Sequence, residues 1–306
     1  MKADKATKEE SSFTEQVYPH VPVMVREVLH FWVTKPSGFY VDLTLGMGGH
    51  TEMLLTRYPQ ARCLGVDWDL KSFEIAKKRL AAWGDRVLLR HANFTEIGKI
   101  LRELGQEKAD GILFDLGPST FQILQAGYGL SYQKEAPLDM RFGLEAQKPH
   151  TAAELLKVLS SSELEELLVT YGELPKGLAR SLGRAIHAAG PKIQTTTDLI
   201  GVLSKITTHR GVWARVFQSL RILVNGEINN LEKLLAEIPG ILNQGGRAVA
   251  ISFHSLEDRA VKRIFRQYQS EKIFKVLTSS SMAATSAEIA SNPKARSARL
   301  RAAEKI

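Results

Sequence analysis

The sequence contains one cysteine, Cys63, and no apolar run of the roughly 18 to 20 residues that a bilayer span requires. A single cysteine excludes a disulfide framework within the chain and a zinc site made of several thiolates. The first residues, MKADKATKEESSFTEQ, lack the hydrophobic segment of an export signal. We therefore expect no metal site, no membrane association, a cytoplasmic location and a disordered tail over residues 1–18.

The chain is short of acidic residues relative to basic ones, with 33 against 41 and a net charge of +8. The excess is concentrated in three acid-poor stretches: residues 176–221, residues 259–266 and the closing segment 292–305. One such stretch is often only a solvated helix face. Three in one chain favour a nucleic-acid partner.

Strand and helix patterns alternate along the first part of the chain. Buried strands are expected in GFYVDLTL (38–45), ARCLGVDWD (61–69), RVLLRHANF (86–94) and ADGILFDLG (109–117), with amphipathic helices between them. This alternation predicts an α/β fold with a doubly wound, mostly parallel sheet.

The strand pattern stops after the fourth strand and returns in GGRAVAISFHS (245–255). The simplest interpretation is one domain formed by residues 19–122 and 218–306, with an inserted helical domain at 123–217 between the fourth and fifth strands. Near the end of the chain, KIFKVLT (272–278) is expected to be an antiparallel edge strand, and residues 279–297 are expected to be loop.

Residues 41–51, VDLTLGMGGHT, place a glycine-rich turn between the first expected strand and a helix. Such a turn lets backbone N–H groups approach a ligand and directs a helix N-terminus towards it. The third glycine of the dinucleotide pattern G-x-G-x-x-G is absent, and so is the Lys-Ser or Lys-Thr of a phosphate-binding loop. S-adenosylmethionine is therefore favoured over a dinucleotide, which stays the weaker alternative.

Acidic residues near the expected strand ends also favour S-adenosylmethionine over a dinucleotide. Asp67 ends the second strand, where a carboxylate can accept hydrogen bonds from both ribose hydroxyls of an adenosine. Asp42 and Asp115 add negative charge, which attracts a sulfonium and an ammonium and repels a pyrophosphate. For Asp42, a purely structural role as a cap of the glycine turn stays open.

Five stretches of the chain resemble one known family. They are HVPVMVREVL (20–29), LGMGGHT (45–51), DLGPSTFQ (115–122) with PLDMRF (137–142), RVFQSLRILVNGEI (215–228), and ISFHSLEDRAVKR (251–263) with NPKARSARLRAAEK (292–305). Together they make the chain similar to the bacterial 16S rRNA (cytosine-N4)-methyltransferases, the RsmH or MraW family. The turn differs from the usual family sequence at Pro118 and Phe121.

The resemblance implies a class I methyltransferase sheet whose inserted helical domain helps to hold the cytosine and the rRNA. It implies an enzyme that uses S-adenosylmethionine to methylate N4 of a cytosine in the decoding region of 16S rRNA, within the small ribosomal subunit. The cofactor-binding residues that it implies are Gly48, Gly49, His50, Asp67, Phe94, Asp115 and Gln122.

Methylation of an exocyclic amine is an in-line displacement at the sulfonium methyl, so alignment of the reactants supplies much of the catalysis. Hydrogen-bond acceptors near the amine help, because they localise its lone pair. The turn after the fourth strand is the place for them, and Asp115 and Ser119 are the candidate catalytic residues, with Asp139 a third.

Several residues are candidates for contact with the RNA. His254 is expected either to touch the base or its sugar, or to brace its loop through Glu257 or Asp258. Phe253 and Phe121 are expected either to stack on a flipped base or to be core. Arg180, Arg184 and His187 recur on one helical face that suits phosphates.

A second hypothesis is a catalytically weak RNA-binding or ribosome-assembly protein with the same fold and cofactor pocket. The sequence leaves open whether the chain is a monomer or a homodimer. It also leaves open whether the substrate is naked rRNA or the assembled subunit.

Overall fold

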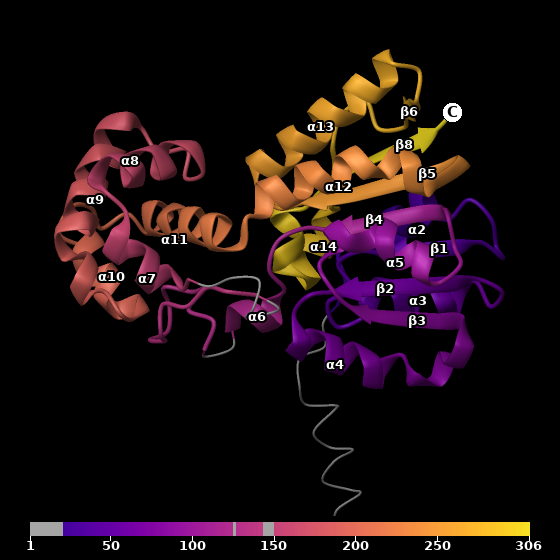
Figure 1. Ribbon diagram of the computed structural model, residues 1–306, viewed down its shortest axis with the longest axis horizontal. Helices are drawn as coiled ribbons and strands as arrows, with labels where there is room; N and C mark the ends of the chain where they lie inside the picture. Colours follow the sequence, from indigo (N-terminus) through magenta and orange to yellow (C-terminus); the bar gives the residue numbers. More distant parts are fainter. Residues whose placement is uncertain (1–20, 125–126, 143–149) are drawn as a thin grey trace, which may run out of the picture.

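The computed structural model describes residues 21–124, 127–142 and 150–306, so the predicted tail at 1–18 lies outside the described residues. The strands form one eight-stranded sheet, and the seven strands of its main path lie in the order β3-β2-β1-β4-β5-β8-β6, with β7 paired to β8 (Figure 1). Their bounds are β1 (Phe39–Asp42), β2 (Arg62–Asp67), β3 (Val87–His91), β4 (Ala109–Asp115), β5 (Leu242–Ser252), β6 (Phe274–Val276), β7 (Met282–Ala283) and β8 (Arg299–Lys305).

Pairing is parallel from β3 through β5 and antiparallel for β6, β7 and β8. The predicted α/β class with a mostly parallel sheet is confirmed. The four early strands lie within the predicted segments, and β6 is the antiparallel edge strand expected in KIFKVLT. Since parallel strands end at the same edge, the turns after β1, β2, β4 and β5 gather there.

Helices cover both faces of the sheet. On one face, α5 (Ile97–Glu103), α12 (Glu227–Ile241) and α13 (Ser255–Ser270) pack on side chains such as Val66 and Phe114. On the other face, α2 (Val25–Trp32) and α3 (Gly49–Arg57) pack on Leu113 and Val249. A smaller cluster joins α4 (Leu70–Arg79) to the glycine loop through Leu45. These two apolar faces are what keep the strand ends, and hence the site, in register.

Between β4 and β5 the described residues form helices and no strand. The helices are α6 (Thr120–Leu124), α7 (Ala152–Val158), α8 (Ser161–Thr170), α9 (Lys176–Ala189), α10 (Thr196–Leu203), α11 (Arg210–Asn225) and α12. Those from α7 to α11 enclose a second hydrophobic core and lie to one side of the sheet (Figure 1). The division at 122/123 and 217/218 stays a prediction. Both boundaries fall inside helices, α6 and α11, and the second core continues to Val224.

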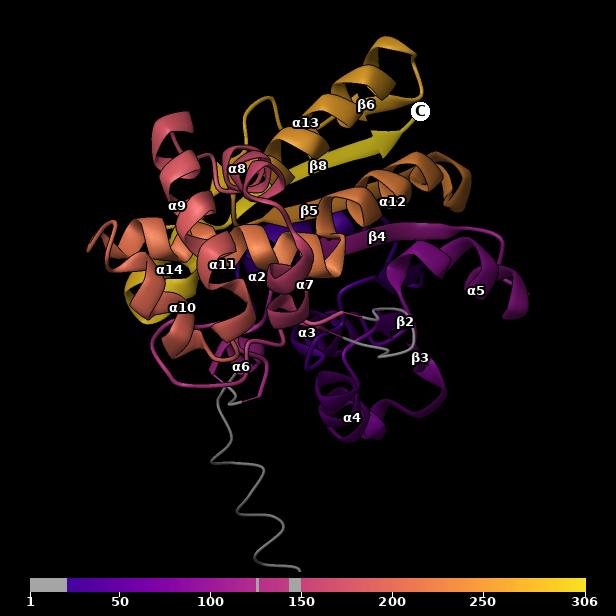
Figure 2. The ribbon, with the colours of Figure 1, turned by 60° about the vertical axis from the view of Figure 1, so that its left-hand side comes forward.

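The C-terminal part differs from the sequence prediction. Residues 279–297, expected to be loop, contain β7, α14 (Ser286–Ser291) and a 3-10 helix, Pro293–Ser297. The segment after them is β8, which lies between β5 and β6 beneath α13 (Figure 2). Leu300 and Ala302 are fully buried, and the guanidinium of Arg301 forms two hydrogen bonds to the carboxylate of Asp258. A strand with this much charge is recognisable only once its distant partner is known.

No helix in the described part of the chain is both long and apolar enough to span a membrane.

Candidate active site

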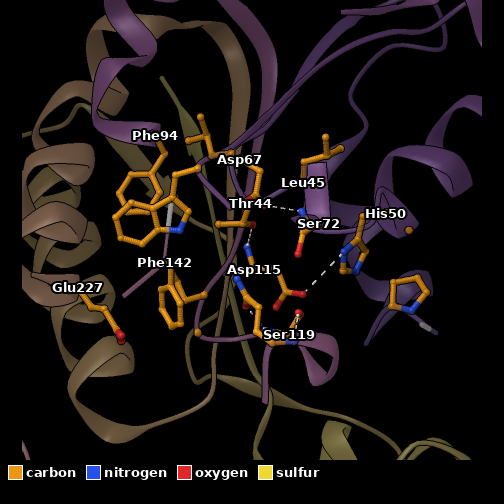
Figure 3. A pocket seen from close by; sticks show the side chains of 18 of the residues that line it. Thr44, Leu45, His50, Asp67, Ser72, Phe94, Asp115, Ser119, Phe142 and Glu227 are labelled. Atoms are coloured by element: carbon orange, nitrogen blue, oxygen red, sulfur yellow. Dashed lines mark hydrogen bonds and ion pairs between the residues drawn. The ribbon is translucent and has the colours of Figure 1, made fainter. Parts of the chain in front are cut away.

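A pocket opens where the parallel strands end (Figure 3). Its walls come from the turns after β1, β2 and β4, from the start of α12 and from the 3-10 helix Pro293–Ser297. This is the edge at which α/β folds bind ligands. Of the predicted cofactor and catalytic residues, the pocket is lined by Gly49, His50, Asp67, Phe94, Asp115, Ser119 and Gln122.

The glycine loop is shaped by backbone conformation. Gly46 and Gly48 have φ values of 52° and 82°, in the left-handed region that favours glycine. Gly48 is the N-cap of α3, and a Cβ there would lie 3.0 Å from Leu80. Gly48 does not line the pocket. Its role in the structure is to turn the chain so that Gly49 and His50 line the pocket.

Asp67 is fixed by the backbone around it. One carboxylate oxygen accepts from the N–H of Gly46 at 2.6 Å, and the other accepts from the N–H of Asp69 at 2.8 Å. Burial raises the pKa of Asp67 to about 7, although these two hydrogen bonds act to lower it. Each oxygen keeps a second lone pair, so the carboxylate can still accept hydrogen bonds from a ligand.

Aromatic rings form the wall beside Asp67. The rings of Trp68 and Phe94 have centroids 6.2 Å apart, and those of Trp68 and Phe142 are 5.9 Å apart. All three line the pocket, as Figure 3 shows for Phe94 and Phe142. A flat heterocycle such as adenine fits such a wall. Sequence reasoning named Phe94 and missed Trp68 and Phe142, although both occur in motifs already singled out.

His50 faces Asp115 across the pocket (Figure 3). The Nε2 of His50 lies 2.9 Å from the carbonyl oxygen of Val23, which can only accept, so Nε2 carries the hydrogen. Nδ1 then points at the carboxylate of Asp115, 3.9 Å away. The chain therefore directs an acceptor nitrogen and a carboxylate towards the same point.

Asp115 has an unused acceptor. Its side chain is 12% exposed, and the buried Oδ1 has no hydrogen-bond partner in the described structure. Burial raises the pKa of its carboxyl, while the positive charge of a protonated His50 and that of Lys294 act to lower it. A buried acceptor without a partner is costly unless a ligand donates to it. The Asp115 carboxylate therefore fits a bound donor.

Asp42 lies behind the glycine loop. Its carboxylate accepts from the N–H of Thr44 at 3.3 Å and from the hydroxyl of Thr51 at 2.8 Å, and it does not line the pocket. Burial raises its pKa to about 6. Of the two interpretations left open for Asp42, this geometry matches the structural one.

Gln122 reaches the pocket, but its amide is already used. The amide nitrogen donates to Asp69 at 2.9 Å, and the amide oxygen accepts from the N–H of Ser119 at 2.8 Å. Tyr128 also donates to Asp69, at 2.7 Å. Asp69 thus ties α6 and the segment after it to the end of β2.

Asp139 and His254 have internal partners. Asp139 forms an ion pair with Arg141 at 2.6 Å and does not line the pocket. His254 is the N-cap of α13, and its Nε2 lies 3.2 Å from Glu257 without the alignment of a hydrogen bond. This contact with Glu257 matches the interpretation of His254 as a brace of its loop, the alternative to contact with the base or its sugar. The catalytic role of Asp139 and the substrate role of His254 stay predictions.

The remaining substrate candidates are divided between two regions. Phe253 follows β5, and its ring carries the ammonium of Lys294 at 5.1 Å from the centroid. Arg180 and Arg184 lie exposed on α9, within the group of helices outside the sheet. Arg180 forms an ion pair with Glu165 at 3.1 Å, so part of its charge is already compensated.

A set of charged residues at the far side of the pocket was missed. Glu227, Glu257 and Lys294 all line it, and they come from three distant parts of the sequence. Glu227, His254 and Glu257 offer ligand atoms within 4.8 Å of one another. The buried guanidinium of Arg221 already pairs with Glu227 at 2.9 Å, which supplies the positive charge that a cation would bring.

Comparison with known proteins gives a consistent result. The family described as the MraW methylase family matches residues 17–306. A protein of Geobacter sulfurreducens is 40% identical over 94% of this chain and 99% of its own length. Proteins of Sorangium cellulosum and Thermotoga neapolitana are 42% and 41% identical, over 91% and 96% of their lengths. All three relatives are named ribosomal RNA small subunit methyltransferase H.

Proposed function

The chain belongs to the MraW methylase family, as its motifs predict, and from that premise we propose that it methylates N4 of a cytosine in small-subunit rRNA with S-adenosylmethionine. The observation that carries the proposal is the paired arrangement of Asp67 and Asp115 at the ends of β2 and β4, in one pocket. Asp67 suits the ribose of the adenosine, and Asp115 suits the reacting amine.

The pocket fits this cofactor better than a dinucleotide. Among the described residues that line it, Lys294 is the sole lysine or arginine, and it lies on the side away from Asp67. A pyrophosphate would therefore meet carboxylates without a cation beside the glycine loop, whereas a sulfonium is attracted by them. Asp67 would hold the ribose, Trp68 and Phe94 the adenine, and Gly49 and His50 the methionine end.

When bound, the cofactor supplies a methyl group on a positively charged sulfur. Asp115 orients the acceptor by accepting a hydrogen bond from the N4 amine through its free Oδ1. Asp67, Gly49 and His50 would hold the methyl donor, and the transfer would form an N–C bond to N4 at the expense of the S–C bond. The N4 proton then passes to the Asp115 carboxylate, with His50 Nδ1 as the next acceptor.

Finer features belong to the same proposal. The target base lies in the decoding region of 16S rRNA, in the assembled small subunit. The helices from α7 to α11 form an inserted domain that binds RNA through the exposed face of α9. A base must leave its stack to reach a buried methyl donor. Phe253 contacts the base in this flipped position.

The experiment uses small subunits from a strain that lacks the enzyme, with methyl-labelled cofactor. The wild-type chain should label the rRNA, and Asp115→Asn should slow labelling at least tenfold at saturating cofactor. A chain that binds cofactor and subunit without labelling would instead be the assembly protein of the second hypothesis. Tight calorimetric binding of NAD without binding of S-adenosylmethionine would exclude both.

A further inference from the structure

Lys294 enters the pocket from the C-terminal segment of the chain. It belongs to the 3-10 helix Pro293–Ser297, whose position is fixed by the fully buried Ala295. The side chain of Asn292 adds a hydrogen bond to the carbonyl of Val21 at 3.1 Å. The backbone that carries Lys294 is therefore held firmly against the sheet.

The ammonium of Lys294 lies over the ring of Phe253, 5.1 Å from its centroid. Within the described structure it forms no hydrogen bond and no ion pair with a carboxylate, although the charge of Asp115 acts on it. Burial lowers the pKa of Lys294, which reflects the loss of water around the ammonium. An ammonium has three donors, and in this position they are free for a ligand.

Asp115 ends β4, and Lys294, in the 3-10 helix before β8, lies over Phe253 at the end of β5, the strand between β4 and β8. Asp115 pairs in register with Ile251, so Phe253 begins the turn directly beside it. Gly117, with φ of 78°, leaves the space beside Phe253 open, since a Cβ there would lie 3.6 Å from Phe253. The result is a free acceptor on Asp115 and a free donor on Lys294 in the same pocket.

The surrounding charge selects a neutral ligand. Asp115, Glu227 and Glu257 line this end of the pocket, and Lys294 is the cation among them. Phe253 and His254 donate backbone hydrogen bonds to Glu257, and the pKa of Glu257 is lowered by His254 even though burial opposes it. A phosphate would be repelled by these carboxylates, so a polar heterocycle with adjacent donor and acceptor atoms fits better.

We infer that Lys294 donates a hydrogen bond to ring N3 of the acceptor cytosine while Asp115 accepts one from its N4 amine. This inference rests on the proposed function. Cytosine presents an amine donor next to the N3 acceptor, whereas uracil presents a carbonyl next to an N–H. Lys294 and Asp115 therefore both find hydrogen-bond partners on cytosine. With uracil, both of these charged side chains would be left without partners, so uracil is rejected.

The role is selection and positioning of the base. A cation at N3 draws the N4 lone pair further into the ring, so it does not make the amine a better nucleophile. Asp115 opposes that effect by accepting the N4 hydrogen. Lys294 thus sets which base is held and at what angle, and the transfer itself depends on Asp115 and the cofactor.

The test combines a protein change with a base change. Lys294→Met, Lys294→Arg and wild type are assayed on subunits reconstituted with cytidine or 3-deazacytidine at the acceptor position, where 3-deazacytidine lacks N3. Wild type should lose about tenfold in kcat/KM on 3-deazacytidine. Lys294→Met should be slow on cytidine but lose less than about twofold further, and Lys294→Arg should regain part of the sensitivity.

The control is Arg296→Met, which removes a positive charge from an exposed side chain of the same 3-10 helix. It should retain the full sensitivity to 3-deazacytidine. Calorimetry should give Lys294→Met the wild-type affinity for S-adenosylmethionine, and thermal unfolding should show no loss of stability.

Full sensitivity to 3-deazacytidine in Lys294→Met overturns the inference and leaves the proposed function intact. So does a matching loss of cofactor affinity, which would place Lys294 on the methionine carboxylate. A wild-type chain that labels no cytosine defeats the proposed function, and this inference with it.

Discussion

In the proposed site, Asp67 is the residue whose charge state should matter most for cofactor binding. Its carboxyl has a pKa of about 7, and the ribose hydroxyls need the ionised form as acceptor. Since an ionised fraction of about one in eleven at pH 6 becomes about ten in eleven at pH 8, cofactor affinity should rise about tenfold between these values. Calorimetry of wild type against Asp67→Asn isolates this contribution, because other titrating groups are common to both.

The same residue affects the stability of the ligand-free chain. The folded pKa of Asp67 lies above the ordinary value of 3.8, so its contribution is present below that value and lost as pH rises through 7. Asp42, with a pKa of about 6, acts in the same direction. The free energy of unfolding should therefore fall between pH 5 and pH 8, and cofactor should restore part of it at pH 8. An unchanged denaturation midpoint across that range contradicts this assignment.

Single residues were the least predictable part of the site. Asp67 and Asp115 are recognisable because they end apolar strands, and Phe94 follows from the family resemblance. Lys294 and Glu257 are brought to the pocket by β8 and α13, whose places depend on contacts such as Arg301 with Asp258. No local pattern contains that information.

At the scale of the element, the glycine loop depends on Gly48. Alanine there meets Leu80 at 3.0 Å in a left-handed backbone, so Gly48→Ala should lower the free energy of unfolding by about 1–3 kcal/mol. Gly201→Ala is the matched control, since Gly201 lies within α10 with open space around it. That change should raise stability by about 0.5–1 kcal/mol. Equal effects in urea denaturation would contradict the account of the loop.

The tie between β2 and α6 can be tested through Tyr128. Its hydroxyl donates to the buried carboxylate of Asp69, so Tyr128→Phe should cost about 1–2 kcal/mol of unfolding free energy. Tyr58→Phe removes a hydroxyl that has no hydrogen bond in the described structure and should cost less than about 0.5 kcal/mol. If both variants unfold at the same denaturant concentration, Asp69 does not organise this segment.

Helices and strands were more predictable than single site residues, because most of them follow from a local pattern of apolar and polar residues. Alternating apolar strands and amphipathic helices placed the sheet from β1 to β5 and the edge strand β6. The failures were β7, α14 and the 3-10 helix Pro293–Ser297, all in a segment expected to be loop, and β8, for which no strand was predicted. The small polar residues around α14 gave no helical pattern, although Thr285 is its N-cap. The charged residues of β8 gave no strand pattern, because Arg301 is neutralised only by Asp258 of the distant α13.

At the scale of the whole molecule, the excess positive charge is unevenly available. Arg180, Arg221, Arg259 and Arg263 all form ion pairs with acids outside their own basic stretches. Arg184, exposed on α9, forms no ion pair or hydrogen bond in the described structure. The count of basic residues therefore overstated the charge available to RNA.

The salt dependence of RNA binding tests this distribution. Arg184→Met should reduce the slope of log affinity against log salt by about 1, because one phosphate contact is lost. Arg180→Met should reduce it less, since Glu165 already compensates that guanidinium. Arg263→Met, on α13, is the control and should leave the slope unchanged. An unaltered slope in Arg184→Met would move the RNA-binding face away from α9.

Methyl transfer to N4 is the central claim, and identification of the modified nucleoside tests it most directly. Small-subunit rRNA methylated by the wild-type chain is digested to nucleosides, and the labelled product is separated and compared with methylcytidine standards. The proposed geometry of Asp115 and Lys294 predicts N4-methylcytidine as the labelled product. Label in 5-methylcytidine or in another base would contradict it.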